Sequence, residues 1–354
     1  MKRLMSTMLV TAVSMLALSG CTAHNAGEPT APSTGASDSR GEVTLIAHDS
    51  LSLPDELAER FHEKTGYTLN ISQLGSGGEA VNQLVLTKNN PLGDVAVVDN
   101  LLAYRAVSEG VFAEDRVNVV DEAYAQAVPG APGLVAFDQG DVCVNVDHEW
   151  FTQHGIDEPR TFDDLADPQY KDLLVAMNPT SSSPGMAFLA ATISQFGDNW
   201  GDYWKRLVDN GMTVTRGWSD AFNVNYSAGP GKGQRPLMVS YSSSPAYAVN
   251  DDMTASSTGA LLDTCFHQVE YLGILTGAAN PEGAKALIEF LLSTEAQEMI
   301  SQENYMFPIN PEAKAPEALV KFGPMASTPH QLDSQTIVEN QQKWLTEWTE
   351  ITSR

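Results

Sequence analysis

Two serine-rich strings contain the residues of this sequence whose type and spacing could bind a polar ligand. The chain of 354 residues reads SSSP at 181–184 and again at 242–245. Serine is a favoured helix N-cap because its hydroxyl accepts a hydrogen bond from a free backbone N–H, and proline suits the first turn, where no N–H is needed. Each string therefore predicts a turn from a strand into a helix, whose N-terminus could hold an anion or a polar group. For either string taken alone, ordinary helix capping is the simpler explanation, because capping is common.

The segments around these strings alternate between strands and helices. Apolar runs rich in strand formers occur at 43–48, 67–72, 94–98, 173–177 and 237–241, and helices are expected from Pro54 to Gly66, over 80–88 and over 186–195. This alternation predicts two α/β units, each with a parallel sheet covered on both faces. In open parallel sheets, ligands bind beyond the carboxyl ends of the strands, where loops and helix N-termini meet.

The residues that follow the predicted strands are small and polar, acidic or aromatic. They are His48, Asp49 and Ser50, the glycine-rich turn at 75–78, Asp99 and Asn100, Ser181, Ser182 and Ser183, Trp218 and Ser219, and the second serine string. Helix capping alone does not require acids and an aromatic at so many strand ends. The sequence therefore predicts one ligand cleft shared by both units.

The first forty residues predict export and anchoring. Lys2 and Arg3 precede a short apolar stretch ending in LSGC at 18–21, which is typical of an export signal and too short for an ordinary transmembrane span. The ending resembles the lipobox of bacterial lipoproteins, so we expect removal of residues 1–20 and a lipid on Cys21 that anchors the protein to the cell membrane. A plain signal peptide cleaved elsewhere is the alternative. Residues 21–40, rich in Ala, Gly, Pro, Ser and Thr, are expected to form a flexible tether.

Charge and cysteine content narrow the possible partners. The chain has 20 Lys and Arg against 45 Asp and Glu, a formal net charge of −25, which disfavours nucleic acid and would attract a cationic solute. Besides Cys21 there are two cysteines, Cys143 and Cys265, and an even pair outside the cytoplasm is typical of a disulfide. Two buried thiols, or one nucleophilic cysteine, are the other interpretations.

Six segments resemble one known family. In order they are NPTSSSPG, TVTRGWSDAF, MVSYSSSPAY, QVEYLGIL, NYMFPI and WLTEWTEITSR, and they are similar to segments of the thiamine-binding substrate-binding proteins of bacterial ABC transporters. The resemblance covers most of 43–354. It implies an α/β, type II periplasmic-binding-protein fold with two lobes, each a mixed sheet flanked by helices, joined by crossing hinge strands. In this family the ligand is trapped as the lobes close.

The resemblance also implies a division of the chain and a function. Lobe 1 is expected to comprise 41–140 and 268–325, and lobe 2 to comprise 141–267 and 326–354. The insertion AGPGKGQRP at 228–236 is expected to be a surface loop. The family implies a protein that is not an enzyme, needs no cofactor or metal, and delivers thiamine or a thiamine phosphate to an ABC permease.

The ligand residues implied by the resemblance suit thiamine chemically. Thiamine has a cationic thiazolium and a flat aminopyrimidine, which favour aromatic faces and a nearby carboxylate. The positions matching the family's aromatic ligand residues are Trp218, Tyr241, Tyr247 and Tyr305, and those matching its phosphate site are Ser181, Ser182, Ser183 and Gly185. Asp49, Ser50, Asp99 and Ser219 complete the predicted set. Glu270 is a further carboxylate that could instead be a solvated surface acid, and His48 and Leu51 replace the tyrosine and phenylalanine of relatives.

The family fold implies that the two cysteines are partners of each other. Cys143 lies in LVAFDQGDVCVNV, the run that leaves the first unit, and Cys265 lies in CFHQVEYLGIL, the run that returns. In a two-lobed binding protein these connections lie side by side at the hinge. The resemblance therefore implies a Cys143–Cys265 disulfide that staples the hinge.

Other functions stay open at this stage. An iron-binding protein would use paired tyrosines with histidine and acid, but this chain has no adjacent Tyr-Tyr pair. An anion-binding protein would use the serine turns without the aromatics. A thiaminase-like enzyme would need a nucleophilic cysteine, for which Cys143 is the candidate. A serine hydrolase is disfavoured because the GWSDA run at 217–221 lacks the final glycine of a nucleophile elbow.

Overall fold

The computed structural model describes residues 40–126 and 128–353. The segment from Asp38 to the C-terminus forms one compact unit. The predicted signal peptide, the predicted lipid site at Cys21 and almost all of the predicted tether lie outside the described residues. None of the described helices is both long and apolar enough to cross a membrane.

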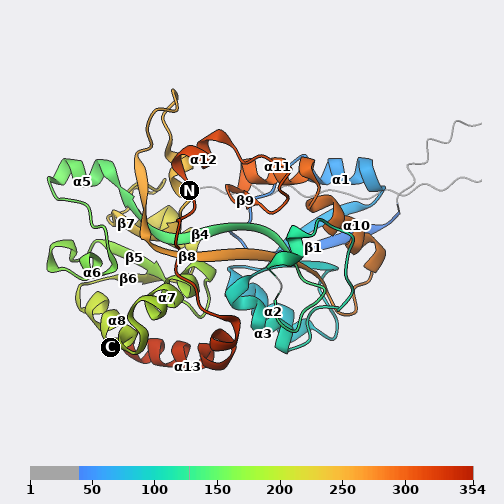
Figure 1. Cartoon of the computed structure of the whole chain (residues 1–354), viewed down its shortest axis with the longest axis horizontal. Coiled ribbons are helices and arrows are strands. Elements are labelled where there is room, and N and C mark those ends of the chain that lie inside the picture. Colours follow the sequence, from blue (N-terminus) through green and yellow to red (C-terminus); the bar gives the residue numbers. More distant parts are fainter. Residues whose placement is uncertain (1–39, 127, 354) are drawn as a thin grey trace, which may run out of the picture. The chain divides into compact units, whose positions relative to one another are not determined.

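One mixed sheet runs through the unit in the strand order β2-β1-β3-β8-β4-β7-β5-β6, with β9 paired to β4 (Figure 1). The strands are β1 (Glu42–Ala47), β2 (Thr68–Gln73), β3 (Val95–Asp99), β4 (Val135–Asp147), β5 (Leu174–Met177), β6 (Thr213–Thr215), β7 (Leu237–Tyr241), β8 (Thr258–Ile274) and β9 (Phe307–Pro308). Strands β1 to β3 are parallel at one end of the sheet, and β5 to β7 are parallel at the other. The long antiparallel pair β4 and β8 connects the two ends.

Helices supply the apolar side chains that cover each parallel group. Around β1 to β3 these are α1 (Leu57–Thr65), α2 (Gly77–Thr87), α3 (Asn100–Ser108), α4 (Glu122–Ala125), α10 (Pro281–Leu291) and α11 (Thr294–Asn304). Around β5 to β7 they are α5 (His148–His154), α6 (Phe162–Leu165), α7 (Ser183–Phe196), α8 (Trp200–Asp209), α9 (Trp218–Asp220) and α13 (Ser334–Thr352). The remaining turns are α12 (Glu317–Phe322), η1 (Pro168–Tyr170), η2 (Gly197–Asn199), η3 (Ala221–Asn225) and η4 (Ser244–Ala248).

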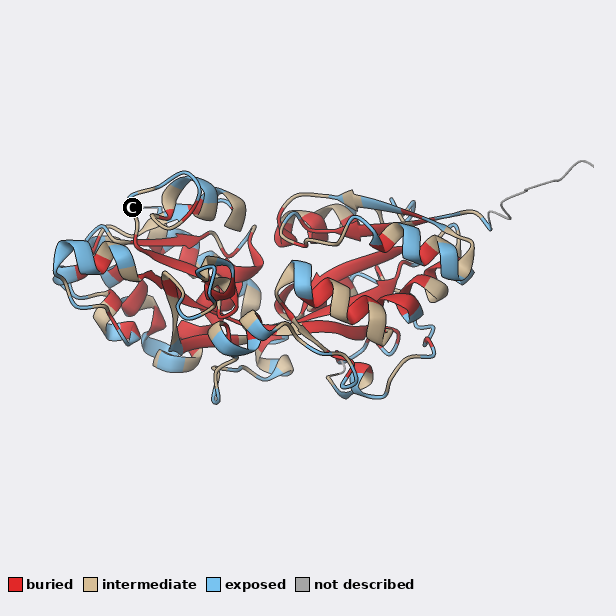
Figure 2. Ribbon diagram, turned by 90° about the horizontal axis from the view of Figure 1, so that it is seen from above, coloured by how far each residue is buried: buried red, intermediate tan, exposed pale blue. Residues whose placement is uncertain are grey.

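Two hydrophobic cores define two lobes, and Figure 2 shows buried strands inside each of them. Lobe 1 is built around the core of β1 to β3, and lobe 2 around the core of β5 to β7. On β4 the side chains change from the first core at Phe137 to the second at Val142, and on β8 they change between Phe266 and Val269. The crossing strands therefore link the lobes as the sequence predicts, although the predicted lobe bounds remain a proposal.

The first half of the chain forms the predicted elements with small shifts. Leu57 and Phe61 are buried on α1, and Gly66 ends that helix with a φ of 77°, a left-handed conformation that favours glycine. Helix α2 begins at Gly77, three residues before the predicted start. The cause is local, because the Glu79 side chain accepts the Ser76 backbone N–H at 3.2 Å and extends the helix toward its N-terminus.

The two serine strings fold differently from each other. Ser182 caps α7 by accepting the Gly185 N–H at 3.3 Å, which confirms the predicted strand-to-helix turn. A Cβ at Gly185 would lie 2.6 Å from the Met177 carbonyl oxygen, so only glycine lets α7 pack this close to β5. The second string enters the short 3₁₀ helix η4 instead of an α-helix. Its N-terminus is therefore a weaker anion site than the sequence pattern suggested.

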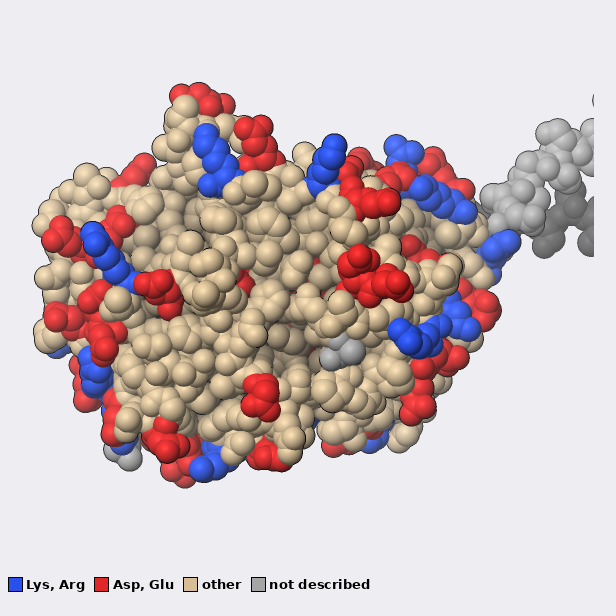
Figure 3. All heavy atoms as spheres, in the orientation of Figure 1, with Lys and Arg blue, Asp and Glu red and all other residues tan. Residues whose placement is uncertain are grey.

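The acidic excess of the composition lies on the surface. On the face shown in Figure 3, Asp and Glu side chains are interspersed with Lys and Arg side chains, mainly toward the edges of the view. The predicted loop at 228–236 also lies on the surface, with Lys232 exposed at its tip. An acidic surface attracts cationic solutes, as the net charge of −25 predicts.

Candidate functional site

A cleft of about 290 Å³ opens between the lobes. Lobe 1 contributes the loop after β1, the end of β2 and the end of α11, and lobe 2 contributes α9, the end of β7 and η4. The lining residues are Asp49, Ser50, Leu51, Ser52, Gln73 and Asn304 from lobe 1, and Trp218, Tyr241, Ser243, Ser244 and Tyr247 from lobe 2. Five of the predicted ligand residues therefore lie together in one cleft at the carboxyl ends of the strands.

Two larger surface hollows lie beside α5, entirely within lobe 2. Their volumes are about 580 and 750 Å³, and their linings include His148 and Asp157. None of the predicted ligand residues lines them. The interlobe cleft is the stronger candidate because both lobes contribute to it and because the ends of β2, β7 and α11 meet there.

Trp218 is held as a flat aromatic wall of the cleft. Its indole N–H donates to Ser240 Oγ at 2.9 Å, and Ser240 in turn shares a hydrogen bond with Ser244 Oγ at 2.8 Å. The indole also stacks on Phe222, with ring centroids 4.7 Å apart and planes 12° apart. Sequence reasoning missed Phe222, whose spacing of four residues from Trp218 is the available signal. The other face of Trp218 is left to line the cleft.

Tyr247 and Tyr305 meet across the two lobes. Their rings stack with centroids 3.7 Å apart, and the Tyr247 hydroxyl donates to the Glu303 carbonyl oxygen at 2.9 Å. Tyr305 ends α11 with a φ of 54° and is not among the described residues that line the cleft. In this arrangement no ligand ring fits between the two tyrosines, so they close one side of the cleft. Their role as ligand residues stays a prediction.

Asp49 places a carboxylate at the entrance of the cleft. Its backbone N–H donates to the Gly75 carbonyl oxygen at 2.8 Å, which fixes the loop after β1 against the loop after β2. The Asp49 side chain is exposed and accepts Ser219 Oγ at 3.5 Å from the other lobe. Asp49, Ser50 and Ser219 therefore lie close together, as the sequence predicts.

The first serine turn contacts lobe 1 instead of lining the cleft. The Ser181 carbonyl oxygen accepts hydrogen bonds from Ser76 Oγ at 2.5 Å and from the Gly78 N–H at 3.0 Å. Ser183 Oγ donates to Asp99 Oδ2, and the other oxygen of Asp99 accepts the Leu102 N–H at 3.2 Å. Asp99 and the serine turn thus join the two lobes in this structure. The predicted phosphate site at 181–185 stays a prediction.

Behind the lobe 1 wall lies a buried acidic network that the sequence only partly indicated. His48 bonds Glu270 Oε1 through Nε2 at 2.9 Å and Ser50 Oγ through Nδ1 at 2.9 Å. Asn304 Nδ2 donates to Asp138 Oδ2 at 3.1 Å. The interpretation of Glu270 as a solvated surface acid is wrong, since it is 2 % exposed. Asp138 was missed, although it directly follows Phe137 in an apolar run.

The network shifts the protonation of its members. Burial raises the pKa of Asp99 and raises the pKa of Asp138 well above its usual value, with the charge of Glu270 adding to the effect at Asp138. Burial alone would lower the pKa of His48, but the negative charge of Glu270 and its hydrogen bond raise it overall. Burial, and then the charge of Glu270, raises the pKa of Tyr241, which keeps its hydroxyl proton.

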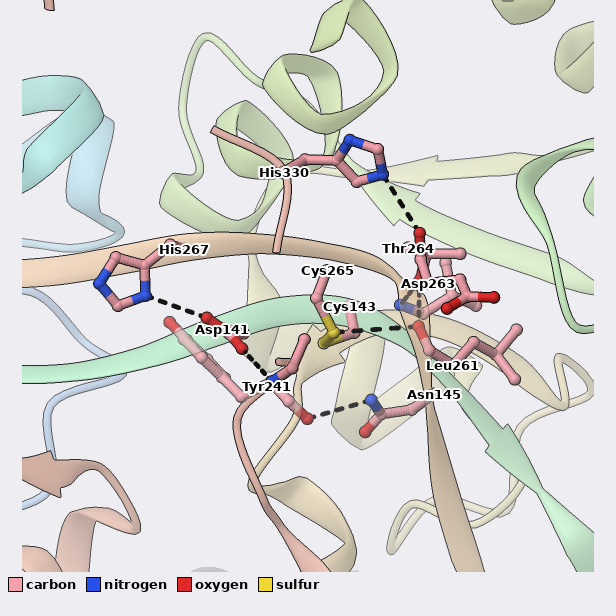
Figure 4. The surroundings of a disulfide bond; sticks show 12 residues. Asp141, Cys143, Asn145, Tyr241, Leu261, Asp263, Thr264, Cys265, His267 and His330 are labelled. Carbon is pink, nitrogen blue, oxygen red and sulfur yellow. Dashed lines mark hydrogen bonds and ion pairs between the residues drawn. A yellow bond between two sulfur atoms is a disulfide. The ribbon is translucent and has the colours of Figure 1, made fainter. Parts of the chain in front are cut away.

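Cys143 and Cys265 form a disulfide between β4 and β8 (Figure 4). Both residues are fully buried, and their Cα atoms are 4.1 Å apart. The pairing predicted from the family resemblance is present in the structure. A nucleophilic role for Cys143 needs a free thiolate, so the disulfide removes the residue on which the thiaminase-like alternative depended. Within residues 40–126 and 128–353, no group of three or more His, Cys, Asp or Glu side chains is placed to hold a metal ion.

Comparison with known proteins agrees with this geometry. The model of the bacterial extracellular solute-binding protein family matches residues 90–322. The thiamine-binding periplasmic protein of Brucella abortus biovar 1 is 26 % identical over 336 residues, covering 90 % of this chain and 94 % of the relative. The protein of the same name from Salmonella typhimurium is 27 % identical over 321 residues, covering 88 % of this chain and 94 % of the relative.

A solved structure shows the same fold. The structure of a periplasmic thiamin binding protein superposes with a TM-score of 0.77 at 24 % identity, covering 88 % of this chain and 96 % of the other. The two-lobed arrangement with crossing strands is thus a type II periplasmic-binding-protein fold. The family match covers well over half of the chain, so this protein belongs to the bacterial extracellular solute-binding protein family.

Proposed function

We propose that the protein is an extracytoplasmic solute-binding lipoprotein that captures thiamine between its lobes and delivers it to an ABC permease. The observation that carries the proposal is the cleft itself, which combines the aromatic faces of Trp218 and Tyr241 with the carboxylate of Asp49. A cationic, two-ringed ligand gains from both kinds of group, because cations are attracted to aromatic faces as well as to carboxylates. The relatives named as thiamine-binding proteins support the same ligand.

The size and burial of the cleft suit a compact ligand. Its volume of about 290 Å³ lies at the lower end of the range of roughly 300–1,000 Å³ that is usual for small-molecule sites. Trp218 is already fixed by Ser240 and Phe222, so binding requires little ordering of this wall. We propose that the lobes open about β4 and β8 to admit thiamine and close over it.

We propose that the protein binds thiamine without converting it chemically. The cysteine in the disulfide is unavailable as a nucleophile, and the aromatic and hydroxyl groups of the cleft serve recognition. We place the protein outside the cytoplasm, with the lipid on Cys21 holding it at the membrane beside its permease. We further propose that lobe 1 comprises 41–140 and 268–325, and that lobe 2 comprises 141–267 and 326–354.

A thiamine phosphate is the second candidate ligand. The observation that favours it is the N-terminus of α7, where Ser182 caps a helix of 14 residues close to the contact between the lobes. A phosphate there would have to displace the bonds from Ser76 and Gly78 to Ser181. We therefore rank unphosphorylated thiamine first.

Calorimetric titration of the compact unit, residues 38–354, with thiamine tests the proposal. One thiamine should bind per chain, and mass analysis after incubation should recover it intact. Absence of binding at high micromolar thiamine would refute the ligand assignment. Recovery of cleaved thiamine would place the protein among enzymes instead.

A further inference from the structure

Three buried carboxylates lie in a row across neighbouring strands behind the lobe 1 wall of the cleft. Glu270 on β8 is the register partner of Asp99 on β3 and of Asp138 on β4. Each of the three residues is 2 % exposed. Side chains of directly opposite residues on antiparallel strands point to the same face, with Cβ atoms about 4.5–5.5 Å apart. The register therefore puts the three carboxyl groups next to one another.

Two carboxyl oxygens of this row are buried without a partner among the described residues. Glu270 Oε2 and Asp138 Oδ1 have no hydrogen-bond donor, whereas the second oxygen of each is occupied by His48 and by Asn304, respectively. Two ionised carboxylates this close in a buried site repel each other strongly, and one of them retains a proton instead. A proton between the two unpartnered oxygens would satisfy both.

The two partners decide which carboxyl group keeps the proton. His48 can carry a positive charge and therefore favours the ionised form of Glu270. Asn304 is a neutral amide and offers Asp138 a weaker interaction. Burial and the charge of Glu270 raise the pKa of Asp138, which agrees with a proton on Asp138.

Two residues that line the cleft connect it to this row. Asn304 bonds Asp138 directly, and Ser50 bonds His48, which in turn bonds Glu270. One side chain therefore separates Asp138 from the cleft at Asn304, and two side chains separate Glu270 from it at Ser50. None of the described residues that line the cleft is Lys or Arg, and the basic group that bonds the row is His48.

We infer that Asp138 and Glu270 share one proton, held on Asp138, and that the ionised Glu270 and Asp99 together outweigh the positive charge of His48. The net negative charge that remains makes the cleft selective for a cationic ligand. This inference rests on the function proposed above and names the residue that reads the charge of thiamine. Glu270 acts across the cleft wall through the electrostatic field, which a low-dielectric interior screens weakly. Asp99 adds negative charge at the far end of the row.

Calorimetry with a matched pair of ligands tests the inference. The pair is thiamine and its uncharged isostere, in which a thiophene ring replaces the thiazolium. Glu270→Gln should weaken thiamine binding about tenfold or more and change the binding of the isostere by less than about threefold, since only thiamine carries the charge. Asp138→Asn keeps a neutral donor beside Glu270 and should change the affinity for either ligand by less than about threefold.

Asp94→Asn is the control for loss of a buried carboxylate. Asp94 is 5 % exposed and precedes the other end of β3, about 16 Å from Asp99 at the usual rise per residue of a strand. It accepts the backbone N–H groups of Thr44 and Asn280. Its variant should leave the preference for thiamine over the isostere unchanged.

The outcomes separate the inference from the proposed function. If Glu270→Gln weakened the binding of both ligands equally, Glu270 would have a structural role and the inference would be overturned. The inference would also be overturned if Asp138→Asn weakened thiamine binding as much as Glu270→Gln does. If the wild type bound neither ligand, the proposed function would fail and the selectivity with it.

The shared proton is tested separately by infrared spectroscopy. Spectra at neutral pH should show one protonated carboxyl band, which Asp138→Asn removes. Absence of that band in the wild type would refute the shared proton.

Discussion

The two walls of the cleft are built from different chemistry. The lobe 2 wall presents aromatic rings and hydroxyl groups, with Trp218 fixed by Ser240 and Phe222. The lobe 1 wall presents small polar groups, behind which His48 and Glu270 lie buried. We propose from this difference that lobe 2 recognises the shape and rings of the ligand, whereas lobe 1 recognises its charge.

The hinge must hold these two walls in register. Strands β4 and β8 pair along most of their length, and the disulfide joins them on the lobe 2 side of the changeover between the two cores, beside Val142 and Phe266. Ser183 and Asp99, and Tyr247 and Tyr305, add contacts on either side of the cleft. We propose that the walls separate and close by bending about this strand pair, which keeps them aligned along the hinge.

Removing the disulfide should have the largest effect and should act on stability. The Cys143→Ala, Cys265→Ala double variant releases a covalent loop of 122 residues, so we expect a loss of about 4 kcal/mol in the free energy of unfolding. Denaturant unfolding measures this loss, and the folded fraction should still bind thiamine. Two titratable thiols in the denatured, unreduced wild type, expressed without Cys21, would contradict the bond.

Trp218→Ala should remove the main ring contact of the lobe 2 wall. Aromatic stacking contributes about 0.5–1.5 kcal/mol beyond the buried area of the ring, so its loss should weaken thiamine binding about tenfold or more. Calorimetry should show a similar loss for the uncharged isostere, because its rings can stack on Trp218 in the same way. Trp218→Phe, which keeps an aromatic face, is the matched control. A fall in melting temperature with unchanged affinity per folded molecule would make Trp218 a core residue.

A phosphate group on the ligand should show whether the electrostatic potential in the cleft is negative. Thiamine monophosphate brings negative charge toward a site whose lobe 1 wall is backed by Glu270 and Asp99. We expect it to bind several-fold more weakly than thiamine, measured by competition at constant ionic strength. Tighter binding of the phosphate would restore the predicted anion site at the first serine turn.

The contribution of Asp138 to the stability of the protein should fall as the pH rises. The pKa of Asp138 is raised in the folded state. Its contribution to the free energy of unfolding is therefore complete below the pKa of about 3.9 that Asp has in the unfolded chain, and it is lost as the pH rises through the pKa of the folded state. The raised pKa values of Asp99 and His48 act in the same direction. Asp138→Asn removes one of these groups and should make the loss of stability above pH 4 shallower, by up to roughly 1.4 kcal/mol per pH unit. A slope identical to that of the wild type in denaturant unfolding would contradict the protonation of Asp138.

Local patterns predicted the elements, and the family resemblance implied the aromatic residues of the lobe 2 wall. The serine string before α7 and the glycine that ends α1 depend on neighbouring residues, so the sequence contains what is needed to place them. Trp218 could be assigned to the cleft because it directly follows a strand. The disulfide could not be predicted from local patterns alone, because the pairing of Cys143 with Cys265 follows from the crossing strands of the family fold.

The lobe 1 network could not be predicted because it depends on pairing between distant strands. Asp138, Glu270 and His48 come from β4, β8 and the loop after β1, and no local pattern states that they meet. An isolated acid in an apolar run was the available sign at Asp138. The stack of Tyr247 on Tyr305 likewise depends on how far the lobes are closed, which the sequence does not state.

A crystal structure of the compact unit with thiamine bound tests the central claim most directly. The account predicts thiamine in the cleft, with an aromatic ring of the ligand against Trp218 and the thiazolium on the side of Asp49 and Ser50. Ligand density at the hollows beside α5, or with the thiazolium turned away from the lobe 1 wall, would contradict the assignment of ring recognition to lobe 2 and charge recognition to lobe 1.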